Sequence, residues 1–146
     1  MRRRWQQART LTAAEWVILW KAAALLPLIE VGLRVFGLKR IKHRLHKHIP
    51  VTPVSSDLSP QIIARIVNGI AGILRARCLA RSLALWWLLK RRGIDSQICM
   101  GVRKENGALM AHAWVELDNI VLNDRAEIQS EFVPITRFHS DWKLSR

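Results

Sequence analysis

One apolar stretch does most to limit what this chain can fold into. From Leu79 to Leu89 nearly every residue is apolar, and Arg81 is the one charge. A helix that is apolar all round must be buried among other elements. The run Lys90-Arg91-Arg92-Gly93 supplies last-turn cations and a terminating glycine. The sequence therefore predicts a buried central helix that begins at Cys78, with the rest of the chain packed around it.

A long helical segment precedes this helix. Thr12 and Glu15 have the spacing of a capping box, in which each residue bonds the other's backbone. The pattern stays helical to about Leu45. We expect two helices here, divided or kinked near Pro27 or Gly37.

A further helix is predicted after the only linker-like stretch, residues 50–60. Ser59-Pro60 is a typical helix start. Apolar residues recur at three- and four-residue spacing from Ile62 to Leu74, so one face of this helix should be buried.

The remainder is predicted as strands. Residues 97–102 and 111–117 alternate in polarity and are joined by a turn at 104–107. Residues 120–122 pair back on the second strand, and 132–138 form a further strand. The predicted fold class is α+β: a helical amino-terminal part, a buried helix and an antiparallel sheet. We divide the chain into a basic helical segment, 1–50, and a core, 51–146, packed as one compact unit.

The charge is strongly unbalanced. The net charge is +13 over 146 residues, and residues 1–48 hold 11 of the bases against two acids. Such a field attracts nucleic acid, an anionic membrane surface or an acidic peptide. The chain has no recognised nucleic-acid motif, so we expect no nucleic acid as partner. We favour a docking role for the basic segment.

Two further observations concern location. Cys78 and Cys99 do not make a disulfide framework, and no cleavage site follows the apolar start, which together favour a reducing cytoplasm. The apolar run from Trp16 to Leu38 is interrupted by Lys21, Pro27, Glu30 and Arg34. A membrane span tolerates few such charges, so we expect at most peripheral contact with a membrane surface.

Cys78 is the first candidate for chemistry. At a helix start, unpaired N–H groups and the helix dipole stabilise a thiolate, and the same groups can hold an oxyanion. Arg75 and Arg77 add positive potential. The alternative interpretation is a small buried residue, which is common for a lone cysteine.

His112 and Asp124 are the second and third candidates. On strand 111–117 His112, Trp114 and Glu116 share one face. A three-residue loop, 117–119, would place Asp124 directly opposite His112, whereas a two-residue loop would place Arg125 there. We predict the first register. Trp114 either lines the substrate cleft beside His112 or is plain packing.

The order of a helix-start cysteine, a strand histidine and an acid on the next strand is that of a nucleophile, a base and an orienting group in a cysteine hydrolase. No cofactor is expected. His43, His46 and His48 stand among cations without a cysteine or carboxylate pair, so we expect a solvated basic face and not a metal site. Core positions are predicted for Cys99, Trp16, Trp20, Trp86 and Trp87.

The chain also resembles a known family, the lasso-peptide biosynthesis B proteins, which are transglutaminase-like, papain-related leader peptidases. The resemblance is carried by five blocks in order: Cys78 to Leu85, Leu88 to Ile94, Gly101-Val102, Ala111 to Glu116 and Leu122 to Asp124. It extends more loosely over residues 11–45.

The resemblance implies a function and partners. Cys78, His112 and Asp124 would be the catalytic triad, and the substrate a ribosomally made precursor, cut between leader and core before an ATP-dependent cyclase closes the ring. Cys78 comes early in the chain, so we expect the split form that works with a separate leader-recognition protein. Two alternatives stay open: a transglutaminase-type acyl transferase with the same residues, and a non-catalytic basic adaptor binding membrane or nucleic acid.

Overall fold

The computed structural model describes residues 11–47 and 58–138. In chain order the elements are α2 (Ala13–Lys47), α3 (Pro60–Leu74), α4 (Cys78–Lys90), β1 (Gln97–Glu105), β2 (Ala108–Leu117), β3 (Ile120–Val121), α5 (Ile128–Glu131) and β4 (Val133–Phe138). The four strands form one antiparallel sheet in the order β3-β2-β1-β4. The predicted α+β class is confirmed.

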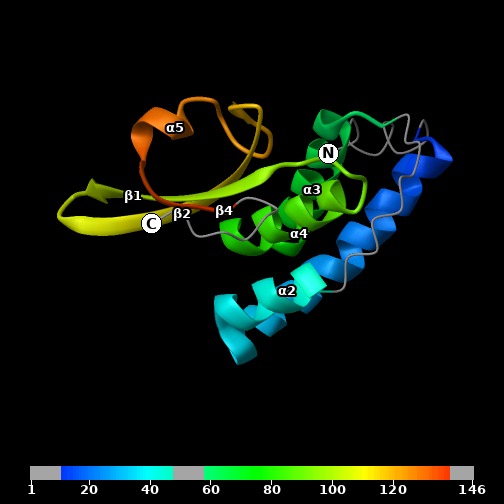
Figure 1. Ribbon diagram of the computed structural model, residues 1–146, viewed down its shortest axis with the longest axis horizontal. Helices are drawn as coiled ribbons and strands as arrows, with labels where there is room; N and C mark the ends of the chain where they lie inside the picture. The colour runs from blue at the N-terminus through cyan, green and yellow to red at the C-terminus, as the bar shows by residue number, and fades with distance from the viewer. Residues whose placement is uncertain (1–10, 48–57, 139–146) are drawn as a thin grey trace.

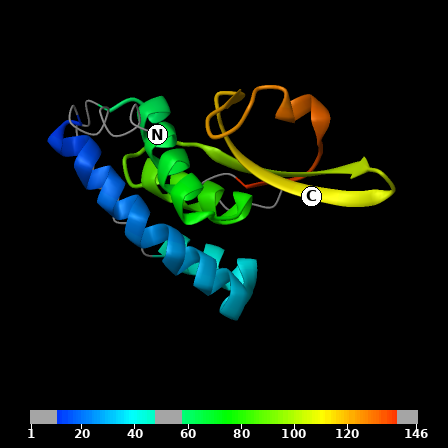
Figure 2. The same ribbon diagram turned by 180° about the vertical axis from the view of Figure 1, so that it is seen from behind.

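The helices and the sheet form separate layers. Figure 1 shows α4 between α2 and the sheet, with α5 on the other side of the sheet. Seen from behind in Figure 2, α3 lies beside α2. The hairpin of β1 and β2 extends away from the helices, so its turn lies at the opposite end of the molecule from the start of α2.

The amino-terminal helix begins as predicted and breaks at one of the two expected places. The backbone N–H of Thr12 donates to Glu15 Oε2 at 2.7 Å, and the N–H of Glu15 donates to Thr12 Oγ1 at 3.3 Å. The break is at Gly37, which has φ 74° and ψ 167°. Pro27 stays inside the helix. Gly37 is the break because glycine adopts a positive φ without steric cost.

The main core lies between the helices and one face of the sheet. Its buried members on α2 are Ile18, Ala22, Leu26, Ile29 and Ile41, and α4 contributes most of its length. From the sheet, Ile98 and Val115 close the core. Part of the predicted basic segment is therefore built into the same core as the rest. The boundary at residue 50 lies outside the described residues and stays a prediction.

Two predicted core residues are not buried. Trp86 is 2% exposed, as expected, but Trp16 is 40% and Trp20 67% exposed. The prediction for Trp16 and Trp20 was wrong because α2 is apolar on both sides, and only the side that carries Ile18 and Ala22 meets the core.

A second, smaller core lies on the opposite face of the sheet. It consists of Cys99, Trp114, Ile128 and Phe132. The short helix α5, which the sequence analysis did not predict, supplies Ile128 to it. Residues 112–114 of β2 thus lie between two packed layers.

Candidate active site

His112 is held on β2 between rings. Its backbone pairs with Gly101 on β1. The imidazole lies 5.4 Å from the Phe132 ring and 6.3 Å from the Trp114 ring, centre to centre, the latter nearly parallel. The side chain is half-buried, with 21% exposed. These contacts restrict the ring to one orientation.

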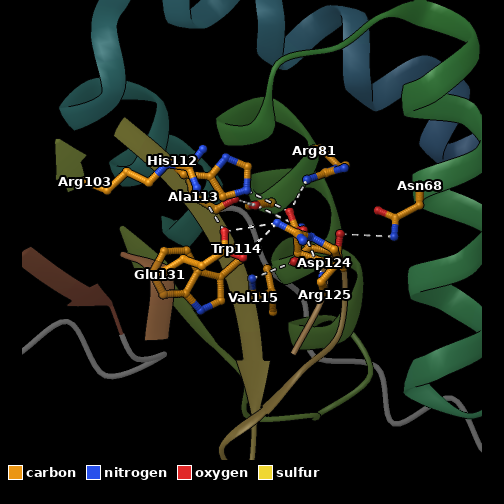
Figure 3. Close-up of polar contacts among 12 residues, drawn as sticks. Asn68, Arg81, Arg103, His112, Ala113, Trp114, Val115, Asp124, Arg125 and Glu131 are labelled. Carbon is orange, nitrogen blue, oxygen red and sulfur yellow. Dashed lines mark hydrogen bonds and ion pairs between the residues drawn. The ribbon is translucent and has the colours of Figure 1, made fainter. Parts of the chain in front are cut away.

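Asp124 accepts a hydrogen bond from His112. Asp124 Oδ2 lies 2.7 Å from His112 Nε2, and Asp124 Oδ1 accepts from the backbone N–H of Arg125 at 2.8 Å. Figure 3 shows the carboxylate turned toward the imidazole. The prediction that the side chains of His112 and Asp124 lie in contact is confirmed.

The register that predicted this contact was wrong. Glu116 pairs with Val121 and Leu117 with Ile120, so the hairpin has the two-residue loop Asp118-Asn119. Both loop residues have positive φ, 50° and 64°. Two-residue turns with positive φ at both positions match the twist of the strands, and Asp and Asn both tolerate that conformation.

The contact forms because β3 is short. After Val121 the N–H of Leu122 still donates to the Val115 carbonyl at 2.9 Å, but the N–H of Val115 donates to the side chain of Asn123 at 2.8 Å, and the ladder ends there. The edge of β2 beside His112 is therefore free of a paired strand. The loop that follows β3 bends across this edge and brings Asp124 to His112, where a continued ladder would have brought Arg125.

Arg81 completes the charge arrangement. Its Nη2 lies 3.0 Å from Asp124 Oδ2, the oxygen that also bonds His112. Burial raises the pKa of Asp124, but the hydrogen bond from His112, the backbone N–H of Arg125 and the charges of His112 and Arg81 outweigh it. The net result is a pKa below the ordinary value, so Asp124 is a carboxylate at neutral pH.

The protonation of the His112 ring follows from this. A carboxylate only accepts hydrogen bonds, so the nitrogen bonded to it, Nε2, carries a proton. In the neutral imidazole Nδ1 is then unprotonated and can accept a proton from another group. This is the tautomer that a general base next to a thiol requires.

Cys78 is the first residue of α4 and is half-buried. Arg77 caps the helix without a side-chain hydrogen bond, which leaves the first-turn N–H groups without a capping side chain. Arg81 and Ser82 follow one helical turn after Cys78 and lie on the same side of the helix. Arg81 bonds Asp124, and Ser82 Oγ donates to the carbonyl of Ala113 at 3.0 Å. The first turns of α4 thus contact Asp124 through Arg81, and the residue after His112 through Ser82.

A buried network fixes α4 against the loop of Asp124. Asn123 Nδ2 donates to Ser82 Oγ at 3.0 Å, and Ser82 Oγ donates in turn to Ala113. Asn68 on α3 donates to the Asn123 carbonyl at 3.2 Å. The neighbours of His112 and Asp124 in sequence, Ala113 and Asn123, are therefore joined through one serine of the central helix.

Trp114 is anchored behind His112. Its indole N–H donates to Glu116 Oε1 at 2.7 Å, and the ring is 1% exposed. This burial favours packing over direct contact with a substrate. The substrate-binding role of Trp114 stays a prediction.

Glu116 is a buried carboxylate with several donors. Gln97 and Gln129 donate to it at 3.0 and 2.9 Å, in addition to Trp114. Burial raises the pKa of Glu116, but the hydrogen bonds from Trp114, Gln129 and Cys99 and the charge of Arg137 outweigh it, so the pKa is below its ordinary value. Burial, together with the charge and hydrogen bond of Glu116, raises the pKa of the Cys99 thiol to about 12. Cys99 is a core residue, as predicted.

The sequence analysis did not assign site roles to Arg81, Ser82, Asn123 and Phe132. Arg81 had a detectable signal, since it is the one charge in an otherwise apolar helix. A buried charge needs a partner of opposite sign, and the sequence has few acids that could pair with Arg81. Ser82, Asn123 and Phe132 had no such signal, because their contacts join segments that are distant in sequence.

Comparison with known proteins identifies a family for this chain. Residues 22–137 match the family model of the Transglutaminase-like superfamily. The chain belongs to the Transglutaminase-like superfamily. The match includes most of α2 as well as the segments that carry Cys78, His112 and Asp124. Neither the curated proteins nor the solved structures contain a significant match to the chain.

Membership in this superfamily is compatible with a cysteine peptidase or an acyltransferase. Both activities pass through a thioester on a cysteine, and they differ in whether water or an amine resolves it.

Proposed function

We propose that this protein is a cysteine peptidase that removes the leader from the precursor of a lasso peptide. The observation that carries the proposal is the 2.7 Å contact of His112 Nε2 with Asp124 Oδ2, made at the edge of β2 that α4 reaches. Superfamily membership supports the cysteine chemistry. The five sequence blocks that resemble the lasso-peptide biosynthesis B proteins support the substrate.

Each member of the proposed triad has one task. His112 Nδ1 takes the proton of the Cys78 thiol, and the thiolate attacks the scissile carbonyl carbon. Asp124 holds the ring and stabilises the imidazolium that forms. The first-turn N–H groups of α4 stabilise the oxyanion.

The remaining steps release both parts of the substrate. The imidazolium gives its proton to the leaving amine as the C–N bond breaks, which frees the amino end of the core. Water then gives a proton to His112 and attacks the thioester, so that the leader leaves as a carboxylate and Cys78 regains its thiol proton. The freed core amine is the group that an ATP-dependent cyclase would join to a side-chain carboxylate.

The proposal includes partners and a location. We propose that a separate leader-recognition protein presents the precursor, and that the reaction takes place in the cytoplasm. Docking of an acidic leader would be assisted by the positive charge of residues 1–48.

The experiment is incubation of the full chain with the precursor peptide, with and without the recognition protein, read by mass spectrometry. Cys78→Ala should reduce cleavage by about 10³-fold or more while the thermal melt is retained. Cys99→Ala is the matched control and should keep activity, because Cys99 is a core residue. Persistent cleavage by Cys78→Ala would refute the proposal.

The same assay separates the acyl transferase from the peptidase. An added small amine should leave the leader product unchanged if water resolves the thioester. A leader product that carries the mass of the amine would identify the transferase.

A further inference from the structure

The outer side of α2 is an exposed apolar stripe. Leu28 is 70% exposed, Trp20 67%, Val35 65% and Val31 60%. The stripe consists of Trp16, Val17, Trp20, Ala24, Pro27, Leu28, Val31 and Val35.

These residues share one side of the helix. At 100° per residue they lie opposite the buried side, which carries Ile18, Ala22, Leu26 and Ile29. From Trp16 to Val35 the stripe is about 28 Å long, at 1.5 Å per residue. Folded proteins seldom leave a contiguous apolar surface of this length open to water unless it contacts something else.

Cations border the stripe. Lys21 and Arg34 lie along its two sides, and both are exposed. Burial, and then the positive charges of Arg91 and Arg92, lower the pKa of Lys21. Beyond the break at Gly37 the exposed residues include Lys39, Arg40, Arg44 and Lys47.

The two acids of α2 are not presented beside the stripe. Glu15 is buried and bonded to Thr12 at the start of the helix. Glu30 Oε1 pairs with Arg77 Nε at 2.8 Å, on the side of α2 toward α4. The same oxygen also lies 3.9 Å from Nη2 of Arg34, whose side chain stays 66% exposed. The outward surface of α2 is thus apolar along its centre and positive at its borders.

We infer that this stripe docks on an anionic lipid surface, with α2 lying in the plane of the headgroups. Apolar residues and tryptophan enter the boundary between headgroups and acyl chains, and flanking lysine and arginine bind anionic headgroups. This inference does not depend on the proposed peptidase activity.

A surface position explains the helix better than a membrane span. Between Ala13 and Leu45, α2 is long and apolar enough to cross a membrane by length and composition. Its inner side, however, is packed in the main core, and Lys21, Glu30 and Arg34 interrupt its apolar run. Crossing a bilayer would require α2 to leave that core and carry these charges into hydrocarbon.

Lipid also fits the stripe better than a protein partner. Trp20, Ala24, Pro27, Leu28 and Val31 include no polar side chain that could orient a partner by a hydrogen bond, apart from the indole N–H. Protein interfaces normally carry about one hydrogen bond per 100–200 Å². A fluid apolar layer needs none.

The test is co-sedimentation of the full chain with vesicles of phosphatidylcholine alone, or of phosphatidylcholine with one third phosphatidylglycerol. We expect binding to the anionic vesicles, weakened by added salt. Leu28→Glu should reduce this binding by about tenfold or more, because it places a negative charge in the middle of the stripe.

Leu109→Glu is the matched control. Leu109 is 73% exposed but lies near the turn of the β1–β2 hairpin, far from the start of α2. It should leave vesicle binding unchanged. Val31→Glu is a second stripe variant, and thermal melts of all three variants show whether each is folded.

Three results would overturn the inference. The first is no binding to anionic vesicles. The second is equal binding by Leu28→Glu and Leu109→Glu. The third is a dimer, measured by light scattering, that Leu28→Glu dissociates while vesicles capture nothing; a second copy of the chain would then cover the stripe.

Discussion

At the scale of single residues, one carboxylate oxygen organises the site. Asp124 Oδ2 receives both His112 and Arg81, and its second oxygen is held by the backbone of Arg125. The shared oxygen keeps Asp124 ionised and fixes which imidazole nitrogen is protonated. Cys99, the other thiol of the chain, lies in the opposite chemical setting, against the carboxylate of Glu116.

The two thiols should therefore differ in reactivity. Cys99 is fully buried and its pKa is raised to about 12, so it should not react with iodoacetamide in the native protein. Cys78 should give a single adduct, measured by intact mass. Cys78→Ala should give none until urea exposes Cys99. Equal, slow labelling of both thiols would favour the non-catalytic adaptor.

Asp124 should make folding stability depend on acidity. Its pKa in the folded chain is below 3.8, the ordinary value, so its contribution is complete above about pH 4 and is lost as pH falls through the lower folded value. Asp124→Asn should reduce the free energy of unfolding by about 1.5–3 kcal/mol near neutral pH. The difference from the unmodified chain should shrink as the solution is acidified.

Urea titrations at several pH values measure this difference. Asp118→Asn is the control, because Asp118 is exposed in a turn where asparagine has the same backbone preference. A difference that stays constant down to about pH 3 would show that Asp124 does not contribute through its charge.

At the scale of elements, β1 is closely packed at Gly101 against residues of β2 and of the segment that leads into β4. A Cβ added there would lie 2.9 Å from Phe132 Cβ, 3.0 Å from Trp114 and 3.0 Å from the carbonyl of Val133. Phe132 and Trp114 are the rings that hold His112. The pairing of β1 with β4 also shifts at this point, between Met100 and Gly101.

Gly101→Ala should therefore reduce the free energy of unfolding by about 1–3 kcal/mol and lower activity by displacing the rings around His112. Gly72→Ala is the matched control. Gly72 is exposed on α3 with nothing within 4 Å of an added Cβ, so alanine should raise the free energy of unfolding by about 0.5–1 kcal/mol. Both are measured by chemical denaturation. Equal effects of the two substitutions would contradict the packing at Gly101.

At the scale of the whole molecule, one core joins the amino-terminal helix to the catalytic elements. Leu26 of α2 is fully buried in the cluster that includes Leu89 of α4 and Val115 of β2. We expect α2 and the elements that carry Cys78 and His112 to unfold together.

Leu26→Ala should lower the free energy of unfolding by about 2–5 kcal/mol in a single transition, because it leaves a cavity in the shared core. Leu28→Ala, two residues along the same helix but 70% exposed, should change it by about 0.5 kcal/mol or less. Circular dichroism and tryptophan fluorescence should report the same transition. Two separate transitions would show that α2 is an independent unit.

Local sequence was enough to predict most of the helices and strands and the candidate residues Cys78, His112 and Asp124, but not α5 or the contacts of Arg81 and Ser82. Helix starts at Ser59-Pro60 and Cys78, and the order of the strands along the chain, depend on caps, turns and periodicity, which are local properties. His112 and Asp124 were correctly predicted to be neighbours, although the strand register used for that prediction was wrong by one residue.

How those residues meet, and which apolar residues are covered, depend on tertiary packing. Asp124 reaches His112 because β3 ends early and Asn123 bonds Val115 and Ser82, contacts between segments up to 41 residues apart. Similarly, no local pattern distinguishes Ile18 from Trp20 on a helix that is apolar on both sides; packing against α3 and α4 buries the first and leaves the second exposed. Local sequence sets what each segment can form, but burial and pairing depend on which distant segments pack together.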